Sequence, residues 1–148
     1  MNNRFKFRAV LKNKEDYLSE PFLKNDIFDV ISIGFNDNGI QTVTLLGFHY
    51  NGDYSIYEAD AEECELMQCT GLKDKNGKLI YEGDIIQIQG DTGKAKVEYN
   101  LEKGMFLLVG KKYAPSAFMT IRKDYWEVIG NIYTNADLLQ DCEWWKIV

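Results

Sequence analysis

Short stretches of alternating apolar and polar residues recur along this chain, and turns rich in Asn, Asp and Gly separate them. In RFKFRAV, Phe5, Phe7 and Ala9 alternate with charged residues, which is the period-two pattern of a half-buried strand. IFDVISIGF at 27–35 predicts a second strand with the same alternation, and the NDNG that follows predicts a turn. A β-rich run and an NGD hairpin signal at 51–53 come next. These patterns predict a series of β-hairpins.

One stretch of the first half has a helical pattern instead. In DAEECELMQC, Asp60 is placed to accept hydrogen bonds from the free N–H groups of a helix start, and Glu63 follows three residues later as in a capping box. Glu62 and Glu63 also suit the positive end of a helix dipole. The stretch therefore predicts a short helix over 60–69. A capped, solvated first turn explains its carboxylates more simply than a catalytic or metal cluster does.

The second half is almost entirely β in pattern. Five short apolar runs follow one another at 85–89, 94–99, 105–109, 117–122 and 126–133. Strands at intervals of about ten residues predict a small barrel, with Ala95, Val97 and Tyr99 facing inward.

Together these elements predict a mostly β (α+β) fold in two parts. Residues 1–69 form a β-rich N-terminal subdomain, a β-hairpin region that ends in the short helix. Residues 70–148 form an SH3-like barrel followed by a short C-terminal helix, which Thr134 or Asn135 caps. At 148 residues the chain is long enough to bury a real interior.

The stretch TGLKDKNGKLIYEGDIIQI resembles a cation or phosphate loop in composition. A calcium loop that starts at Asp74 would place Lys78 at a ligand position and Leu79 where glycine is required. A phosphate-binding loop requires Ser or Thr after Gly77-Lys78, and the chain has Leu79 there. Both kinds of site are therefore excluded.

The same stretch fits a turn. Asn76-Gly77 between two lysines predicts a two-residue hairpin loop of type I′, with positive φ at both central residues. Gly83-Asp84 then begins the next strand, where the Asp side chain can accept hydrogen bonds from nearby N–H groups.

Three segments of the chain resemble a known family. KFRAV near the start, CTGLKDKNGKLIYEGDIIQI in the middle and WEVIGNIYTNADLL near the end resemble, in this order, the YopX family of bacteriophage and prophage proteins. The segments span nearly the whole chain. The resemblance implies a compact, mostly β protein with an SH3-like barrel in its C-terminal part that forms homo-oligomers. It supplies no catalytic residues.

The charge is unevenly distributed. Of the net −6, residues 1–69 hold 6 Lys and Arg against 12 Asp and Glu, and residues 70–148 hold 11 against 11. An acidic chain argues against sequence-independent nucleic-acid binding, which relies on cations. The neutral second half leaves that function as an alternative. Its residues would be Lys94, Lys96, Lys111, Lys112, Arg122 and Lys123, with Tyr99 or Tyr113 for base stacking.

The chain shows no membrane or secretion signal. No apolar run approaches the roughly 18 residues that span a bilayer, and the first residues lack the apolar segment of a signal peptide. We therefore expect a soluble, cytoplasmic protein of the host cell, with no membrane partner. Cys64, Cys69 and Cys142 are then expected to be reduced thiols.

Catalytic and metal chemistry find little support in the residues. His49 is the only histidine and the chain has no C-x-x-C pair, whereas zinc requires about four nitrogen or sulfur ligands. A Ser-His-Asp triad would have to use His49, and no serine lies in a nucleophile elbow. We predict no catalytic, cofactor-binding or metal-binding residues, and no enzyme.

The remaining candidates are aromatic. Tyr125, Trp126, Trp144 and Trp145 are large amphipathic side chains of the kind that anchor interfaces, although Trp126 also suits core packing at a strand start. The sequence thus favours a non-enzymatic protein-interaction module. It is expected to self-associate and to bind a host or phage protein.

Overall fold

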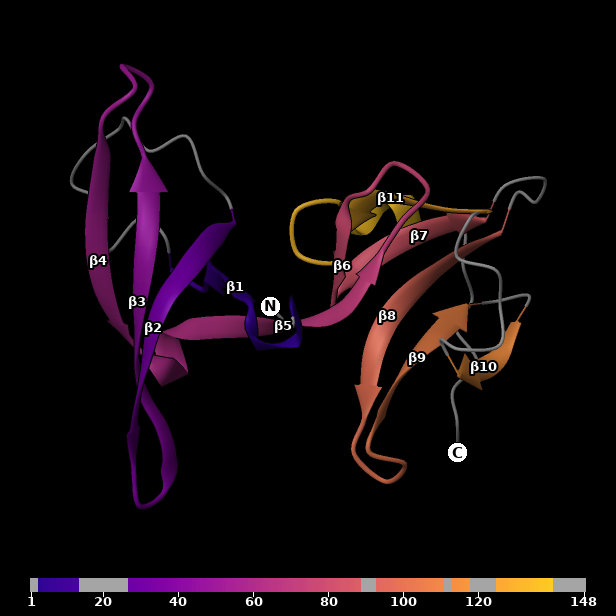
Figure 1. Cartoon of the computed structure of the whole chain (residues 1–148), viewed down its shortest axis with the longest axis horizontal. Helices are drawn as coiled ribbons and strands as arrows, with labels where there is room; N and C mark the ends of the chain where they lie inside the picture. Colours follow the sequence, from indigo (N-terminus) through magenta and orange to yellow (C-terminus); the bar gives the residue numbers. More distant parts are fainter. Residues whose placement is uncertain (1–2, 14–26, 89–92, 111–112, 118–124, 140–148) are drawn as a thin grey trace. The chain divides into compact units, whose positions relative to one another are not determined.

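The computed structural model shows a mostly β protein with antiparallel strands (Figure 1). It describes residues 3–13, 27–88, 93–110, 113–117 and 125–139. Contacts divide the chain into an N-terminal unit, residues 6–67, and a C-terminal unit, residues 1–5 and 68–148. The boundary thus falls inside strand β5, two residues before the position that the sequence suggested.

The N-terminal unit is a sheet with the strand order β4-β3-β2-β1-β5. Its strands are β1 (Phe7–Leu11), β2 (Phe28–Asn36), β3 (Gly39–Phe48), β4 (Tyr54–Asp60) and the first residues of β5 (Cys64–Lys73). Alternation places one side of each strand in a common core. That core contains Ala9, Leu11, Phe28, Val43, Leu45, Ala59 and Cys64.

Strand β2 does not keep the regular alternation that its sequence suggested. Val30 lies opposite Leu45 and Ser32 lies opposite Thr44, so Ile31 is an extra residue in β2. Such a bulge turns the following side chains to the other face. Ile31 itself is 52% exposed.

The helix predicted over 60–69 is wrong. Only Ala61–Glu63 are helical, as a 3-10 turn (η2), and β5 begins at Cys64. The Asp60 side chain makes no capping hydrogen bond. β5 instead lies next to β1 in the sheet, and the N–H of Lys12 donates to the carbonyl of Glu63 at 2.9 Å. Pairing with a distant strand outweighs the weak local preference for helix.

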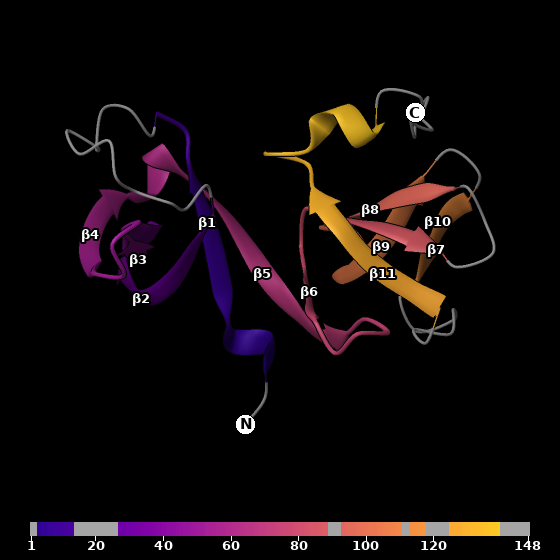
Figure 2. The same ribbon diagram turned by 90° about the horizontal axis from the view of Figure 1, so that it is seen from above.

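The C-terminal unit contains an antiparallel sheet of five strands in the order β10-β9-β8-β7-β11. Figure 2 shows this unit with β11 in front. The five strands are β7 (Asp84–Ile88), β8 (Lys94–Asn100), β9 (Met105–Gly110), β10 (Tyr113–Ala117) and β11 (Trp126–Asn131). The rest of β5 and β6 (Leu79–Tyr81) form the hairpin that precedes them. In the described ranges β10 and β11 are the two ends of an open sheet.

The core of this unit agrees with much of the predicted pattern. It contains Ile80, Ile86, Ala95, Val97, Leu108 and Trp126. Ala95 and Val97 face inward as expected. Tyr99 differs, because it is 37% exposed and packs edge-to-face on Phe106 with ring centroids 5.1 Å apart.

Helix is scarce in the described part of the chain. The 3-10 turns that lie wholly within it are η1 (Asn3–Phe5), η2 and η4 (Ala136–Leu139). The predicted C-terminal helix is therefore a single short turn. None of the described helices is long and apolar enough to cross a membrane.

Candidate functional site

The loop of the β5–β6 hairpin is organised by Asp74. One carboxylate oxygen, Oδ1, accepts hydrogen bonds from the N–H groups of Asn76 at 2.9 Å and Lys78 at 3.0 Å. The N–H of Gly77 donates to the Asp74 carbonyl, and Gly77 has φ of +79°. Among described residues other than glycine none has positive φ, so Asn76 does not. The hairpin is confirmed, but its type I′ loop is wrong. The loop has three residues and ends in a left-handed glycine.

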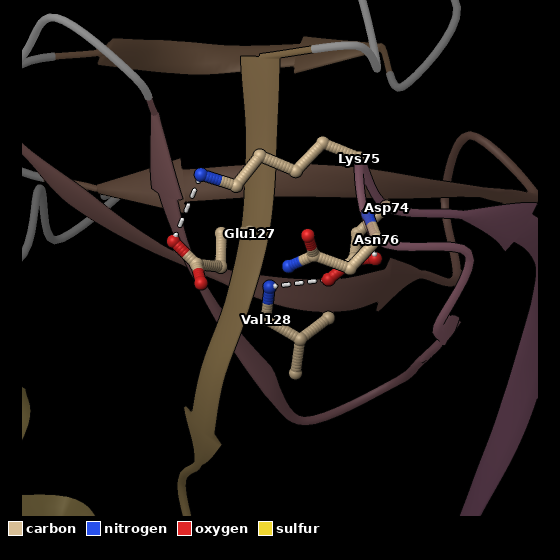
Figure 3. Close-up of polar contacts among 5 residues, drawn as sticks. All are labelled: Asp74, Lys75, Asn76, Glu127 and Val128. Atoms are coloured by element: carbon tan, nitrogen blue, oxygen red, sulfur yellow. Dashed lines mark hydrogen bonds and ion pairs between the residues drawn. The ribbon is translucent and has the colours of Figure 1, made fainter.

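The same aspartate fastens this hairpin to β11 (Figure 3). Its second oxygen, Oδ2, accepts from the N–H of Val128 at 3.0 Å, although 54 positions separate the two residues. Beside it, the N–H of Lys75 donates to the Trp126 carbonyl at 2.9 Å. The Lys75 ammonium lies 3.2 Å from a Glu127 carboxylate oxygen. The loop that resembles a ligand site therefore has a structural role, which is to hold the β5–β6 hairpin against β11.

The hydrogen bonds also decide the ionisation of Asp74. Its side chain is nearly buried, and burial alone raises the pKa of a carboxyl group. The backbone N–H groups of Val128, Lys78 and Asn76 and the charge of Lys78 outweigh that effect. The pKa of Asp74 is consequently held below the ordinary 3.8. The carboxylate stays charged because the backbone occupies both of its oxygens.

The strand entry at Gly83-Asp84 is confirmed. The buried Asp84 accepts from the N–H of Tyr81 at 2.8 Å. Gly83 has φ of +84°, and its N–H donates to the Val97 carbonyl at 2.8 Å. This aspartate, like Asp74, shapes the backbone at a turn.

The aromatic candidates lie in different surroundings. Tyr125 is 43% exposed, whereas Trp126 is fully buried in the core of the C-terminal unit. Trp126 is therefore no part of an exposed surface, because β11 turns its ring inward. Trp144 and Trp145 lie outside the described residues.

The basic candidates of the second half are only partly described. Lys94 and Lys96 project from β8 on the side opposite Ala95. Lys96 lies 3.3 Å from the carboxylate of Glu98, which offsets its charge. Tyr113 begins β10. Lys111, Lys112, Arg122 and Lys123 fall in the ranges that the structure leaves out.

The reactive side chains in the described ranges have structural surroundings. His49 Nε2 and Ser55 Oγ lie 2.7 Å apart and link β3 to β4 beside their connecting turn. Cys64 and Cys69 are buried free thiols. Burial raises the pKa of Cys64, and nearby Glu63 adds to the effect. Among the described residues no group of three His, Cys, Asp or Glu could hold a metal ion.

A different feature stands out in the N-terminal unit, on the side of β3 and β4 that faces away from the core. Tyr54 lies opposite Phe48 and Ile56 lies opposite Leu46, and such directly opposed residues project from the same side of a sheet. Tyr54, Ile56 and Phe48 are 66%, 61% and 40% exposed. They are neighbours by register, so they form one apolar area.

The other end of the same side is acidic. Glu58 and Asp60 continue the alternation of β4, and both are exposed. They lie opposite Thr44 and Thr42. We call the set Phe48, Tyr54, Ile56, Glu58 and Asp60 the open β4 face.

Comparison with known proteins identifies the family. The family model described as "YopX protein" matches residues 6–140. The chain belongs to the YopX family. No curated protein matches its sequence.

Two solved structures resemble this YopX-family protein. Protein EF1440 from Enterococcus faecalis has a TM-score of 0.61 and 22% identity, covering 91% of this chain and 97% of that one. Protein yopX from Bacillus subtilis has a TM-score of 0.50 and 22% identity, covering 95% of this chain and 98% of that one. At this identity the likeness shows a shared fold.

The open β4 face of this YopX-family protein was missed by the sequence patterns for a definite reason. In YSIYEAD, apolar residues occupy both alternating sets, Tyr54 and Ile56 on one side and Tyr57 and Ala59 on the other. Alternation alone therefore does not indicate which side faces solvent. The available signal was a strand apolar on both sides within an acidic stretch.

Proposed function

We propose that this YopX-family protein is a non-enzymatic protein-interaction module that binds another protein through the open β4 face. The observation that carries the proposal is the contiguous exposed area of Phe48, Tyr54 and Ile56 beside two carboxylates. Contiguous apolar areas of this kind mark interaction sites more often than scattered exposed residues do. Aromatic anchors with a charged rim are typical of protein interfaces.

The charge around this face supports a protein partner over a nucleic acid. Residues 27–67 contain no Lys or Arg. They contain the acidic residues Asp29, Asp37, Asp53, Glu58, Asp60, Glu62, Glu63 and Glu65. Phosphate groups would be repelled here, whereas a basic protein surface would be attracted. We place this interaction in the cytoplasm of a bacterial host, as the resemblance to phage proteins implies.

The test is site-specific photo-crosslinking in cells that express the protein. A photoreactive residue at position 56 should give a discrete protein adduct, and one at Leu101, an exposed turn residue of the other unit, should not. The captured protein is then identified and purified. The captured protein should bind the Tyr54→Ser variant with a Kd about tenfold higher than for the wild type, because binding to the variant does not bury a large apolar side chain at this position.

Two results would count against this function. One is an adduct that nuclease treatment removes, which would indicate a nucleic-acid partner. The other is a captured protein that binds the Tyr54→Ser variant as tightly as the wild type.

For the C-terminal unit we propose the SH3-like barrel that the sequence suggested. The support is its five short antiparallel strands in the sequential order β7-β8-β9-β10, with β11 beside β7. Closure would require a strand that joins the β10 and β11 ends. An experimental structure with the two ends unjoined would contradict the barrel.

A further inference from the structure

Most of the open β4 face lies on β4. One edge of this strand pairs with β3, and the opposite edge has no described neighbour. β4 is the last strand in the order of its sheet, next to β3 (Figure 1). The outer backbone groups of an edge strand can pair with an extended segment of another protein. β4 contains no lysine or proline, which are residues that usually protect such edges.

The side chains of β4 form an ordered series along this edge. Tyr54, Ile56, Glu58 and Asp60 occur at every second position and are all exposed. The series is therefore apolar in its first half and acidic in its second half. A segment added beside β4 would place its own alternate side chains about 5 Å from these four.

We propose that the open β4 face takes an extended basic segment of a partner protein. In this segment two large apolar residues and two Lys or Arg residues alternate with other residues. The apolar pair lies beside Tyr54 and Ile56, and the basic pair lies beside Glu58 and Asp60. This inference rests on the proposed function and specifies its partner.

Charge and register argue against a second copy of this chain as the occupant. If two β4 strands paired antiparallel about Tyr57, Ile56 would lie opposite Glu58, and Tyr54 would lie opposite Asp60. Each apolar side chain would then face a carboxylate. The absence of Lys and Arg between residues 27 and 67 gives a second copy no nearby cation with which to neutralise these acids.

The experiment is selection of a random peptide library on the purified full-length protein. Enriched peptides should contain the alternating apolar-and-basic pattern. The selected peptide is then synthesised with a fluorescent label, and its Kd is measured by anisotropy. We expect the Glu58→Gln/Asp60→Asn variant to bind about tenfold more weakly, because two opposite-charge cross-strand pairs are lost. Higher salt should weaken the wild type more than this variant.

Matched controls come from the β8–β9 turn. Leu101 and Glu102 are exposed there, so Leu101→Ser and Glu102→Gln should leave the Kd within about twofold, as surface changes outside a site do. Ile56→Ser should weaken binding about tenfold or more. Circular dichroism and Tm verify that each variant is folded.

Backbone pairing is tested on the peptide. N-methylation of alternate residues in one register should abolish binding, because those N–H groups donate to β4, and methylation in the other register should not. Equal binding of both methylated peptides would overturn the strand-addition model.

Other outcomes overturn the basic-segment proposal but leave the proposed protein-interaction function open. These are enrichment of acidic peptides, failure to enrich any peptide, or an unchanged Kd in the Glu58→Gln/Asp60→Asn variant. A crosslinked protein partner at position 56 could still exist in each case. Loss of self-association in Ile56→Ser would assign the face to a second copy instead, and would also overturn this inference.

Discussion

Asp74 shows how much one carboxylate can organise when backbone N–H groups occupy both of its oxygens. Two of its three donors, Asn76 and Lys78, are local. That part could be anticipated, since aspartate commonly begins such turns. The third donor, Val128, becomes a neighbour only after the chain has folded. At the residue scale, therefore, the sequence predicted the turn but not the hydrogen bond that joins it to β11.

We expect Asp74→Asn to lower the free energy of unfolding by about 1–3 kcal/mol, because the amide NH₂ would face a backbone N–H in place of one oxygen. Urea unfolding at pH 7 measures this change. Asp37→Asn, in the exposed β2–β3 turn, is the control and should leave stability within about 0.5 kcal/mol.

The lowered pKa of Asp74 also gives a pH dependence. The native state holds this proton less tightly than the unfolded chain does, so the stabilisation is complete above the ordinary pKa of 3.8. It is lost as pH falls below that value toward the native pKa. Unfolding curves between pH 2 and 6 should show a smaller loss of stability for Asp74→Asn than for the wild type. Parallel losses would contradict this role.

At the scale of elements, the sequence located turns and several strands, including β2, β8 and β9, but it missed the strand at 64–73 and the bulge in β2. Asn76-Gly77 correctly located a hairpin, because glycine tolerates positive φ. DAEECELMQC was misassigned, because its capping pattern is local whereas its partner β1 is more than fifty positions away. The bulge at Ile31 was invisible for a similar reason, since only pairing with β3 creates it.

The loop type can be tested with two neighbouring substitutions. Gly77→Ala should destabilise the protein by about 1 kcal/mol, because alanine is strained at φ of +79°. Asn76→Ala should be nearly neutral, because residue 76 has negative φ. If both variants lost equally large amounts of unfolding free energy in chemical unfolding, the type I′ loop would be supported instead.

At the scale of the whole molecule, the sequence led to the prediction of self-association. The adjacent Trp144 and Trp145 cannot both face one side of a strand, and the family resemblance also implies homo-oligomers. Light scattering on the purified protein should therefore give at least twice the chain mass of 17.1 kDa. A mass of one chain would contradict this prediction.

Variants can separate this association from the open β4 face. Trp144→Ser/Trp145→Ser should reduce the mass measured by light scattering, because burying the tail between copies would then remove much less apolar surface from water. Ile56→Ser should leave the mass unchanged, since we assign that face to a basic partner.

The sequence by itself determined the β class, the positions of the turns and the family, because period-two patterns, Asn-Gly pairs and family segments are local properties. Ala95 and Val97 were correctly placed in the core for the same reason. Only the tertiary structure decided that Trp126 is buried, that residues 64–73 form a strand and that Asp74 holds β11. It alone also showed which apolar side of β4 is exposed. Each of these depends on partners far away in sequence, and a side chain's burial depends on what packs against it.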